Sequence, residues 1–183
     1  MEHSETYTLD SNDPRIAWTN CEADFIDAVH HKKVEAAILG STPDHALETL
    51  IQREGVHSIM AHTAYSRSVK IDPGGVVHME ARFEAALEQH IAQRALIMSQ
   101  LAKADHLRLT FGNLRDEKFH EHFCHTFTEA VIGEGTDWTK WYDTPDGTVP
   151  NGSGFLMKPG FRHRSHPVTA DEPRWVFAFS FEA

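Results

Sequence analysis

The spacing of apolar residues changes near position 105, and this change constrains the fold more than any other feature of the chain. Before it, apolar residues recur at helical spacing in three segments, 22–33, 45–54 and 79–103. After it, apolar and polar residues alternate, and from Trp175 to Phe181 every second position is a bulky aromatic. The sequence therefore predicts helices in the first half and short strands in the second.

The strands of the second half are expected to form a sandwich or barrel, because turn signals such as Asn151-Gly-Ser-Gly154 separate them at short intervals. In the last strand, the aromatic face should pack on the helices. The opposite face carries Arg174 and then Val176, Ala178 and Ser180, which suit the lining of a barrel mouth. We expect a single domain over 1–183, with 1–104 a mostly helical layer and 105–183 the β core.

Composition narrows the class of partner. The formal net charge is −10, the opposite sign from a general nucleic-acid binder. No apolar run approaches the roughly 18 residues that a membrane helix needs, and the acidic, polar N-terminus does not resemble a signal peptide. Two distant cysteines form no disulfide framework. We therefore expect a cytoplasmic protein that binds neither nucleic acid nor membrane, and a homodimer is compatible with the sequence.

Histidine is the unusual residue, with 14 in 183 positions. Nine are scattered over the first 106 residues and are expected to be ordinary polar positions. His120 and His122 are two residues apart and should share one face of a strand, and a second cluster, His163 and His166, follows about 40 residues later. Because neutral imidazole binds zinc, iron, copper and nickel, His120, His122 and a histidine of the second cluster are candidate ligands of an open metal site.

Cys124 is expected on the same strand face and is a candidate extra ligand, although a buried free thiol is an equally good interpretation. Solvent-facing histidines on an edge strand are the alternative interpretation of the whole cluster.

The segment Gly154-Phe-Leu-Met-Lys-Pro159-Gly160-Phe-Arg-His163 resembles the second motif of the cupins, and His163 to Thr169 followed by Arg174 is similar to the end of prolyl-hydroxylase-like Fe(II)/2-oxoglutarate dioxygenases. The resemblance implies a C-terminal double-stranded β-helix (a cupin-like jelly roll) packed against N-terminal helices in an α+β fold. It also implies that His163 is a ligand and that Arg174 pairs with a carboxylate. Those dioxygenases have a carboxylate where this chain has His122, which favours a three-histidine centre and argues against 2-oxoglutarate.

A second resemblance involves Phe119-His120-x-His122, Gly133-Glu-Gly135-Thr136-Asp-Trp138 and His163-Arg164-Ser165. These segments are similar to a bacterial family of unknown function that carries Phe-His-x-Asp, Gly-Pro-Gly-Thr-x-Trp and His-Arg-Ser motifs. Genes of that family are often neighbours of metal-chaperone GTPases, so this resemblance implies a metal-linked role without a reaction.

Two further residues are candidates for substrate or cosubstrate binding. Ser165 shares the strand face of His163, and Trp138 is suited to wall a pocket, with packing in an aromatic core as the alternative. Arg162 and Arg164 should point to the opposite face and form salt bridges.

The favoured function is a metal-dependent, non-haem Fe(II) oxygenase-like enzyme acting on a small molecule or peptide with a carboxylate near Arg174. One alternative is a non-enzymatic zinc-binding protein of metal homeostasis, with Zn(II) in place of Fe(II). A plain interaction module is a third class. Substrate-dependent oxygen uptake would distinguish the first from the other two.

Overall fold

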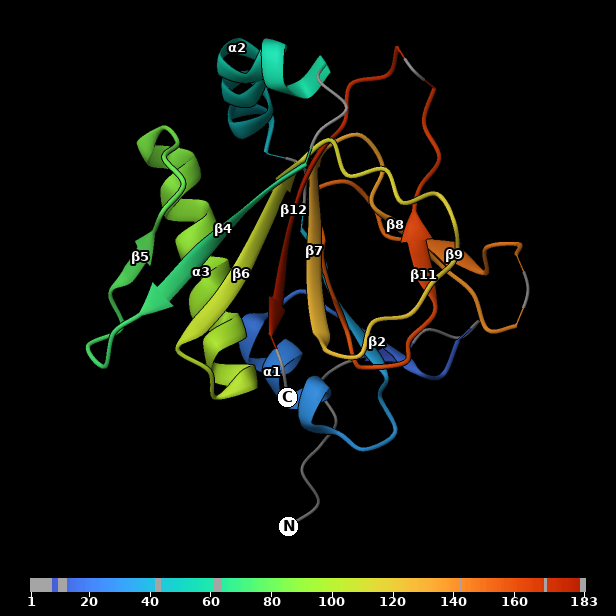
Figure 1. The fold of residues 1–183 in the computed structure, drawn as a ribbon. Coiled ribbons are helices and arrows are strands. Elements are labelled where there is room, and N and C mark those ends of the chain that lie inside the picture. Colours follow the sequence, from blue (N-terminus) through green and yellow to red (C-terminus); the bar gives the residue numbers. More distant parts are fainter. Residues whose placement is uncertain are drawn as a thin grey trace.

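Two β-sheets face each other in the computed structural model, and three helices cover the outer face of the larger sheet (Figure 1). The structure describes residues 8–9, 13–41, 44–60, 64–141, 143–169 and 171–181. The helices are α1 (Glu22–His30), α2 (His45–Met60) and α3 (Ala85–Ala102). No described helix is both long and apolar enough to span a bilayer.

The larger sheet has nine strands, in the order β1-β2-β3-β10-β7-β12-β6-β4-β5. Their bounds are β1 (Thr8–Leu9), β2 (Ile16–Thr19), β3 (Ala36–Leu39), β4 (Ala64–Ile71), β5 (Val77–Met79), β6 (His106–Gly112), β7 (His125–Ile132), β10 (Gly154–Met157) and β12 (Trp175–Phe181). The smaller sheet has the order β11-β8-β9, with β8 (Thr136–Trp138), β9 (Gly147–Thr148) and β11 (His163–Ser165).

The second half of the chain winds back and forth between the two sheets. β6, β7, β10 and β12 form the antiparallel centre of the larger sheet, and β8, β9 and β11 form the smaller one. A single antiparallel bridge between His120 and His163 adds the segment between β6 and β7 to the smaller sheet. This winding is a double-stranded β-helix, so the predicted fold class, an α+β fold with a jelly-roll core, is confirmed.

The alternation in β12 divides the side chains between two environments, as the sequence predicts. Trp175, Phe177 and Phe179 are buried in a core cluster shared with the helices. Val176 and Ala178 point to the opposite side, which faces the smaller sheet and which we call the inner face. Paired residues on β6 and β7 follow the same rule because cross-strand partners share a face.

A second core cluster fills one end of the space between the two sheets. It contains Ile38, Trp138, Val149, Phe155 and Phe161, all almost fully buried. This packing closes one end of the barrel, and the other end stays open.

The first half of the chain contains more β-structure than predicted. It contributes β1 to β5 to the larger sheet in addition to the three helices. β3 is the apolar run Ala36–Leu39, buried at every position, so it lacks the alternation that marks a strand with one wet face. The predicted helix over 79–103 begins only at Ala85, because Val77–Met79 pairs with β4.

Candidate metal centre

Backbone hydrogen bonds fix the positions of the three clustered histidines. The His120 N–H donates to the His163 carbonyl (2.8 Å), and the His163 N–H donates to the His120 carbonyl (3.0 Å). The Gly160 N–H donates to the carbonyl of His122 (2.9 Å). The segment around His122 is irregular, so the strand face predicted for His120 and His122 is not formed as such, and the regular strand β7 begins only at His125.

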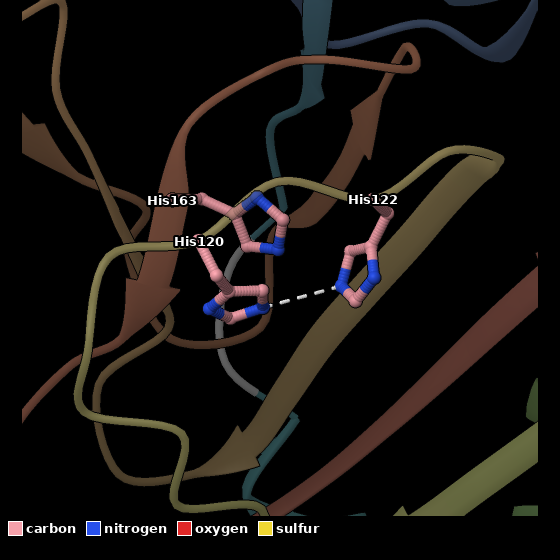
Figure 2. Close-up of side chains that lie close together, drawn as sticks. All are labelled: His120, His122 and His163. Carbon is pink, nitrogen blue, oxygen red and sulfur yellow. Dashed lines mark hydrogen bonds between the residues drawn. The ribbon is translucent and has the colours of Figure 1, made fainter.

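The three imidazole rings nevertheless face one another, as Figure 2 shows. Ring centroids are 4.5 Å apart for His120 and His163, and 4.9 Å for each of the other two pairs. One nitrogen from each ring lies within 4.8 Å of the others, and the Nε2 atoms of His120 and His122 are 3.3 Å apart. Nitrogens bound to one metal at about 2.0–2.1 Å are separated by roughly 3–4 Å. Small ring rotations therefore suffice for all three to bind one ion.

Backbone carbonyls fix the tautomers of two of these rings. His163 Nδ1 lies 2.9 Å from the Phe161 carbonyl and His120 Nδ1 lies 2.8 Å from the Lys118 carbonyl. Because a carbonyl only accepts hydrogen bonds, both Nδ1 atoms carry the proton and donate it. The Nε2 lone pairs of the neutral rings are then directed at the centre of the cluster, an arrangement typical of metal-binding histidines.

Burial favours the neutral forms of His163 and His122. His163 is 4% exposed, and this desolvation lowers its pKa to about 3. Burial, and secondarily the neighbouring His120, also lowers the pKa of His122. Neutral imidazole is the form that binds a metal, so His163 loses no proton on binding at neutral pH.

The cluster lines a cavity of about 570 Å³ at the open end of the barrel. Hydroxyl-bearing side chains from the inner face form the opposite wall, with Thr110 on β6, Thr126 and Thr128 on β7, and Ser180 on β12. A three-histidine set leaves coordination positions of a bound ion open toward this space. The volume is in the range of small-molecule sites.

Arg174 lines the same cavity and is 1% exposed. Its two terminal nitrogens donate to the carbonyls of His166 (2.6 Å) and Gly135 (2.8 Å). The buried Nε–H has no hydrogen-bond partner among the described residues. Desolvation lowers the Arg174 pKa to about 10, so the guanidinium stays charged at neutral pH. An unpaired donor on a buried cation suits an anionic ligand.

Asp137 anchors the smaller sheet beside this arginine. Its fully buried carboxylate accepts hydrogen bonds from Thr148 Oγ1 (2.6 Å), His166 Nδ1 (2.8 Å) and Arg164 Nε (3.0 Å). The Arg164–Asp137 pair, and an Arg162–Asp143 pair at 3.3 Å, are the salt bridges that the sequence predicts for these arginines.

The other predicted site residues divide between cavity and core. Ser165 lines the cavity. Cys124 also lines it, but its Sγ does not belong to the group of converging ligand atoms. Trp138 is packed in the second core cluster and does not line the cavity. Its ring lies against Gly147, where a Cβ would clash with it. Trp138 is therefore a residue of the aromatic core, which was the alternative interpretation of its role.

Ser180 lines the cavity as the sequence predicts, whereas the threonines of the opposite wall and Asp137 were not predicted. The alternation of polar and apolar residues in β6 could have predicted this wall, since Arg108 and Thr110 alternate with the buried Leu107 and Leu109. No local pattern marks Asp137, whose partners lie 11 to 29 residues away.

Fold and site together define a double-stranded β-helix protein with a candidate three-histidine metal centre. No protein-family model matches the chain, and no curated protein is significantly similar to it. The likeness to a bacterial family of unknown function therefore stays a prediction.

Solved structures with a similar fold include several oxygenases. An oxidoreductase of the 2OG-Fe(II) oxygenase family from Burkholderia pseudomallei is 13% identical, covering 89% of this chain and 92% of its own, with a TM-score of 0.45. A prolyl-4-hydroxylase from Pseudomonas putida is 13% identical, covering 89% and 100%, with a TM-score of 0.49. The Escherichia coli ribosomal oxygenase YcfD is 16% identical, covering 97% and 53%, with a TM-score of 0.41.

Proposed function

We propose that the chain is a metal-dependent oxidoreductase, a non-haem Fe(II) oxygenase-like enzyme whose ion is bound by His120, His122 and His163. The observation that carries the proposal is the convergence of three imidazole nitrogens within 4.8 Å at the wall of a cavity of about 570 Å³. When bound, Fe(II) would supply a redox-active centre with open positions for oxygen and an organic ligand.

The chain's own residues would bind and orient the organic ligand. The Nε–H of Arg174 is free to pair with a carboxylate, and burial strengthens such a pair. Ser165 offers a hydroxyl group for hydrogen bonds to the rest of the ligand. The wall opposite the histidines, formed by Thr110, Thr126, Thr128 and Ser180, offers further hydroxyl groups. The carboxylate would belong to the substrate or to a cosubstrate, and the replacement of a carboxylate ligand by His122 argues against 2-oxoglutarate.

Zinc binding without catalysis is the second candidate function. Three neutral imidazoles with an open position also suit Zn(II), and Cys124 lies on the wall of the same cavity. On this alternative, the protein would bind zinc and consume no oxygen.

Metal binding by protein purified without a tag tests the proposal. We expect one equivalent of Fe(II) or Co(II) under anaerobic conditions, and a loss of affinity of at least about 100-fold in His163→Ala, because loss of an outer partner alone commonly costs 10- to 100-fold. His45→Ala is the matched control, since His45 is exposed on α2. Equal affinity in the two variants would disprove the site, and substrate-dependent oxygen uptake would separate the oxygenase from zinc binding.

A further inference from the structure

Side chains that carry a hydroxyl group line the metal cavity on both sheets. Four of them form the wall opposite the histidines, which we call the hydroxyl wall: Thr110, Thr126, Thr128 and Ser180. The others are Ser66 on β4, Thr136 on β8 and Ser165 on β11. No Phe, Tyr or Trp is among the described residues that line this cavity, so it offers no stacking surface for a nucleobase.

Strand pairing arranges part of this lining as a row across the larger sheet. Ser66 is paired with Thr110, and Thr110 is paired with Ala178. Ala178 is paired in turn with Thr128. Because neighbouring strands are about 4.8 Å apart, Thr110 and Thr128 are roughly 10 Å apart, with the methyl group of Ala178 between them. Each threonine also carries a methyl group of its own. The row therefore alternates hydroxyl groups with aliphatic surface, which complements a carbon chain that carries hydroxyl groups.

These hydroxyl groups bond to one another and still have capacity for a ligand. Ser66 Oγ lies 3.1 Å from Thr110 Oγ1, and Thr128 Oγ1 lies 3.0 Å from Thr136 Oγ1. Within each pair only one hydroxyl donates to the other, so the second proton and further lone pairs remain for a ligand. A ligand that both donates and accepts hydrogen bonds can use this capacity, whereas an apolar ligand would leave it unmet in a water-poor site.

Arg174 is the buried cation with which a ligand can pair in this cavity. It is 1% exposed, and its Nε–H has no hydrogen-bond partner among the described residues. Arg164 is instead paired with Asp137 at 3.0 Å. The carboxylate of Asp116 lies beside His120 Nδ1 at 3.4 Å. One unpaired donor on a buried guanidinium suits one carboxylate of a ligand.

Two of the hydroxyl-bearing residues flank this arginine. Arg174 donates to the carbonyls of Gly135 and His166. Thr136 directly follows Gly135 in the chain. Ser165 directly precedes His166 and is paired with Thr136 across β11 and β8. A carboxylate bound to Arg174 would therefore have protein hydroxyl groups beside the carbon atoms that follow it.

The same strand leads from this arginine to the candidate metal ligands. Ser165 and His163 are two residues apart on β11 and share a face. A ligand that reaches from Arg174 to the metal would pass the hydroxyl group of Ser165, and the hydroxyl wall lies on the opposite side of the cavity.

We propose that the cavity binds a polyhydroxylated carboxylic acid. Its carboxylate pairs with the Nε–H of Arg174, and its hydroxylated carbon chain lies between Ser165 and the hydroxyl wall, with the far end at the metal centre. This inference names the substrate class of the candidate metal centre and so rests on the proposed function.

Calorimetric titration of the metal-free protein tests this ligand class without any turnover. D-gluconate is the probe. Hexanoate has the same carboxylate and chain length but no hydroxyl groups on its chain, and sorbitol has the hydroxyl groups but no carboxylate. We expect gluconate to bind at least about tenfold more tightly than either, because each comparison removes a charge-assisted hydrogen bond or several neutral ones. Changing the ligand, and not Arg174, leaves the buried arginine in place.

Threonine-to-valine variants test the hydroxyl wall, because valine keeps the shape of the side chain. Thr128→Val and Thr110→Val should each weaken gluconate binding about three- to tenfold, the effect of losing one hydrogen bond, and leave hexanoate binding unchanged. Thr49→Val is the matched control, because Thr49 is exposed on α2 and does not line the cavity. Circular dichroism checks that each variant is folded. The proposal is overturned if gluconate binds no more tightly than hexanoate or sorbitol, or if Thr128→Val binds it as well as Thr49→Val does.

Cobalt loading, measured by visible absorption after dialysis, separates this proposal from the proposed function. If Co(II) loads and gluconate is not preferred, the ligand class is wrong and the metal centre stands. If gluconate is preferred and Co(II) does not load, the metal centre is wrong and the ligand class stands. If both hold, gluconate should alter the spectrum of the bound Co(II), and an unchanged spectrum would overturn its assignment as a substrate of that centre.

Discussion

Asp137 shows how one residue couples the candidate carboxylate-binding arginine to the smaller sheet. Its carboxylate holds His166 and Arg164, and the His166 carbonyl in turn accepts a hydrogen bond from Arg174. Burial raises the pKa of this carboxyl, but the hydrogen bonds from Thr148, His166 and Arg164 outweigh burial and lower it overall. The ionised form is therefore the stable one in the folded protein.

Asp137→Asn is expected to lower the free energy of unfolding by about 2–3 kcal/mol at neutral pH, because charge-assisted hydrogen bonds are lost in a buried position. A lowered folded-state pKa gives stability that is present above the unfolded value, near 4, and is lost as the pH falls through the folded value. The difference between wild type and variant should therefore begin to shrink as the pH falls below about 4, as measured by urea denaturation.

Asp143→Asn is the control for this change, since the Asp143 side chain is 92% exposed and pairs with Arg162 at the surface. It should alter stability by less than about 1 kcal/mol. An Asp137→Asn deficit that stayed the same at pH 3 and pH 7 would contradict the assigned role of the carboxylate.

At the scale of elements, β12 carries both the core and the site. Phe177 is fully buried between Phe127 and Phe179 on the helix-facing side. The next residue, Ala178, pairs with Thr110 and Thr128 and lines the cavity. Because successive side chains point to opposite faces, core packing constrains one position of β12 and the shape of the cavity constrains the next.

Phe177→Ala is expected to cost about 3–5 kcal/mol of unfolding free energy, because it leaves a void in a close-packed core. Ala178→Ser should change stability by no more than about 0.5 kcal/mol, since the new hydroxyl joins a wall of hydroxyls. Thermal or urea unfolding measures both. Equal losses in the two variants would show that the faces of β12 are assigned wrongly.

At the scale of the whole molecule, the candidate metal ligands join the segment between β6 and β7 to the smaller sheet. His120 and His122 lie between β6 and β7 in a mostly irregular segment, and His163 lies on β11. A bound ion would add bonds between this segment and the smaller sheet, and it binds the folded chain in preference to the unfolded one.

Metal addition should therefore raise the midpoint of thermal unfolding. At a free ion concentration 100 times the Kd, stabilisation is about 2.7 kcal/mol. At roughly 2–4 °C per kcal/mol for a chain of this size, the expected rise is about 5–10 °C by differential scanning calorimetry. A chelator should reverse it, and His163→Ala should not show it. An equal rise in that variant would place the ion elsewhere.

The sequence predicted those structural features that depend on neighbouring residues in the chain. Alternation in β12 predicts which residues face the helices and which face the cavity, and both assignments are confirmed. It was less informative for β3, because a strand buried on both faces has no alternation to detect. The helical prediction for 79–103 extended too far, since the pairing of β5 with β4 is a long-range preference.

Strand parity predicted that His120 and His122 share a face, and the family resemblance added His163, yet the segment that carries the first two is largely irregular. What brings the rings together is the hydrogen bonding of this segment to β11 and Gly160. By itself, the sequence determined the alternation of the strands and the residue types available to a metal, because both are properties of the local chain. Only the tertiary structure decided which nitrogens converge, that Trp138 packs in the core, and that Arg108 and Arg174 line the same cavity, because long-range strand pairing sets those positions.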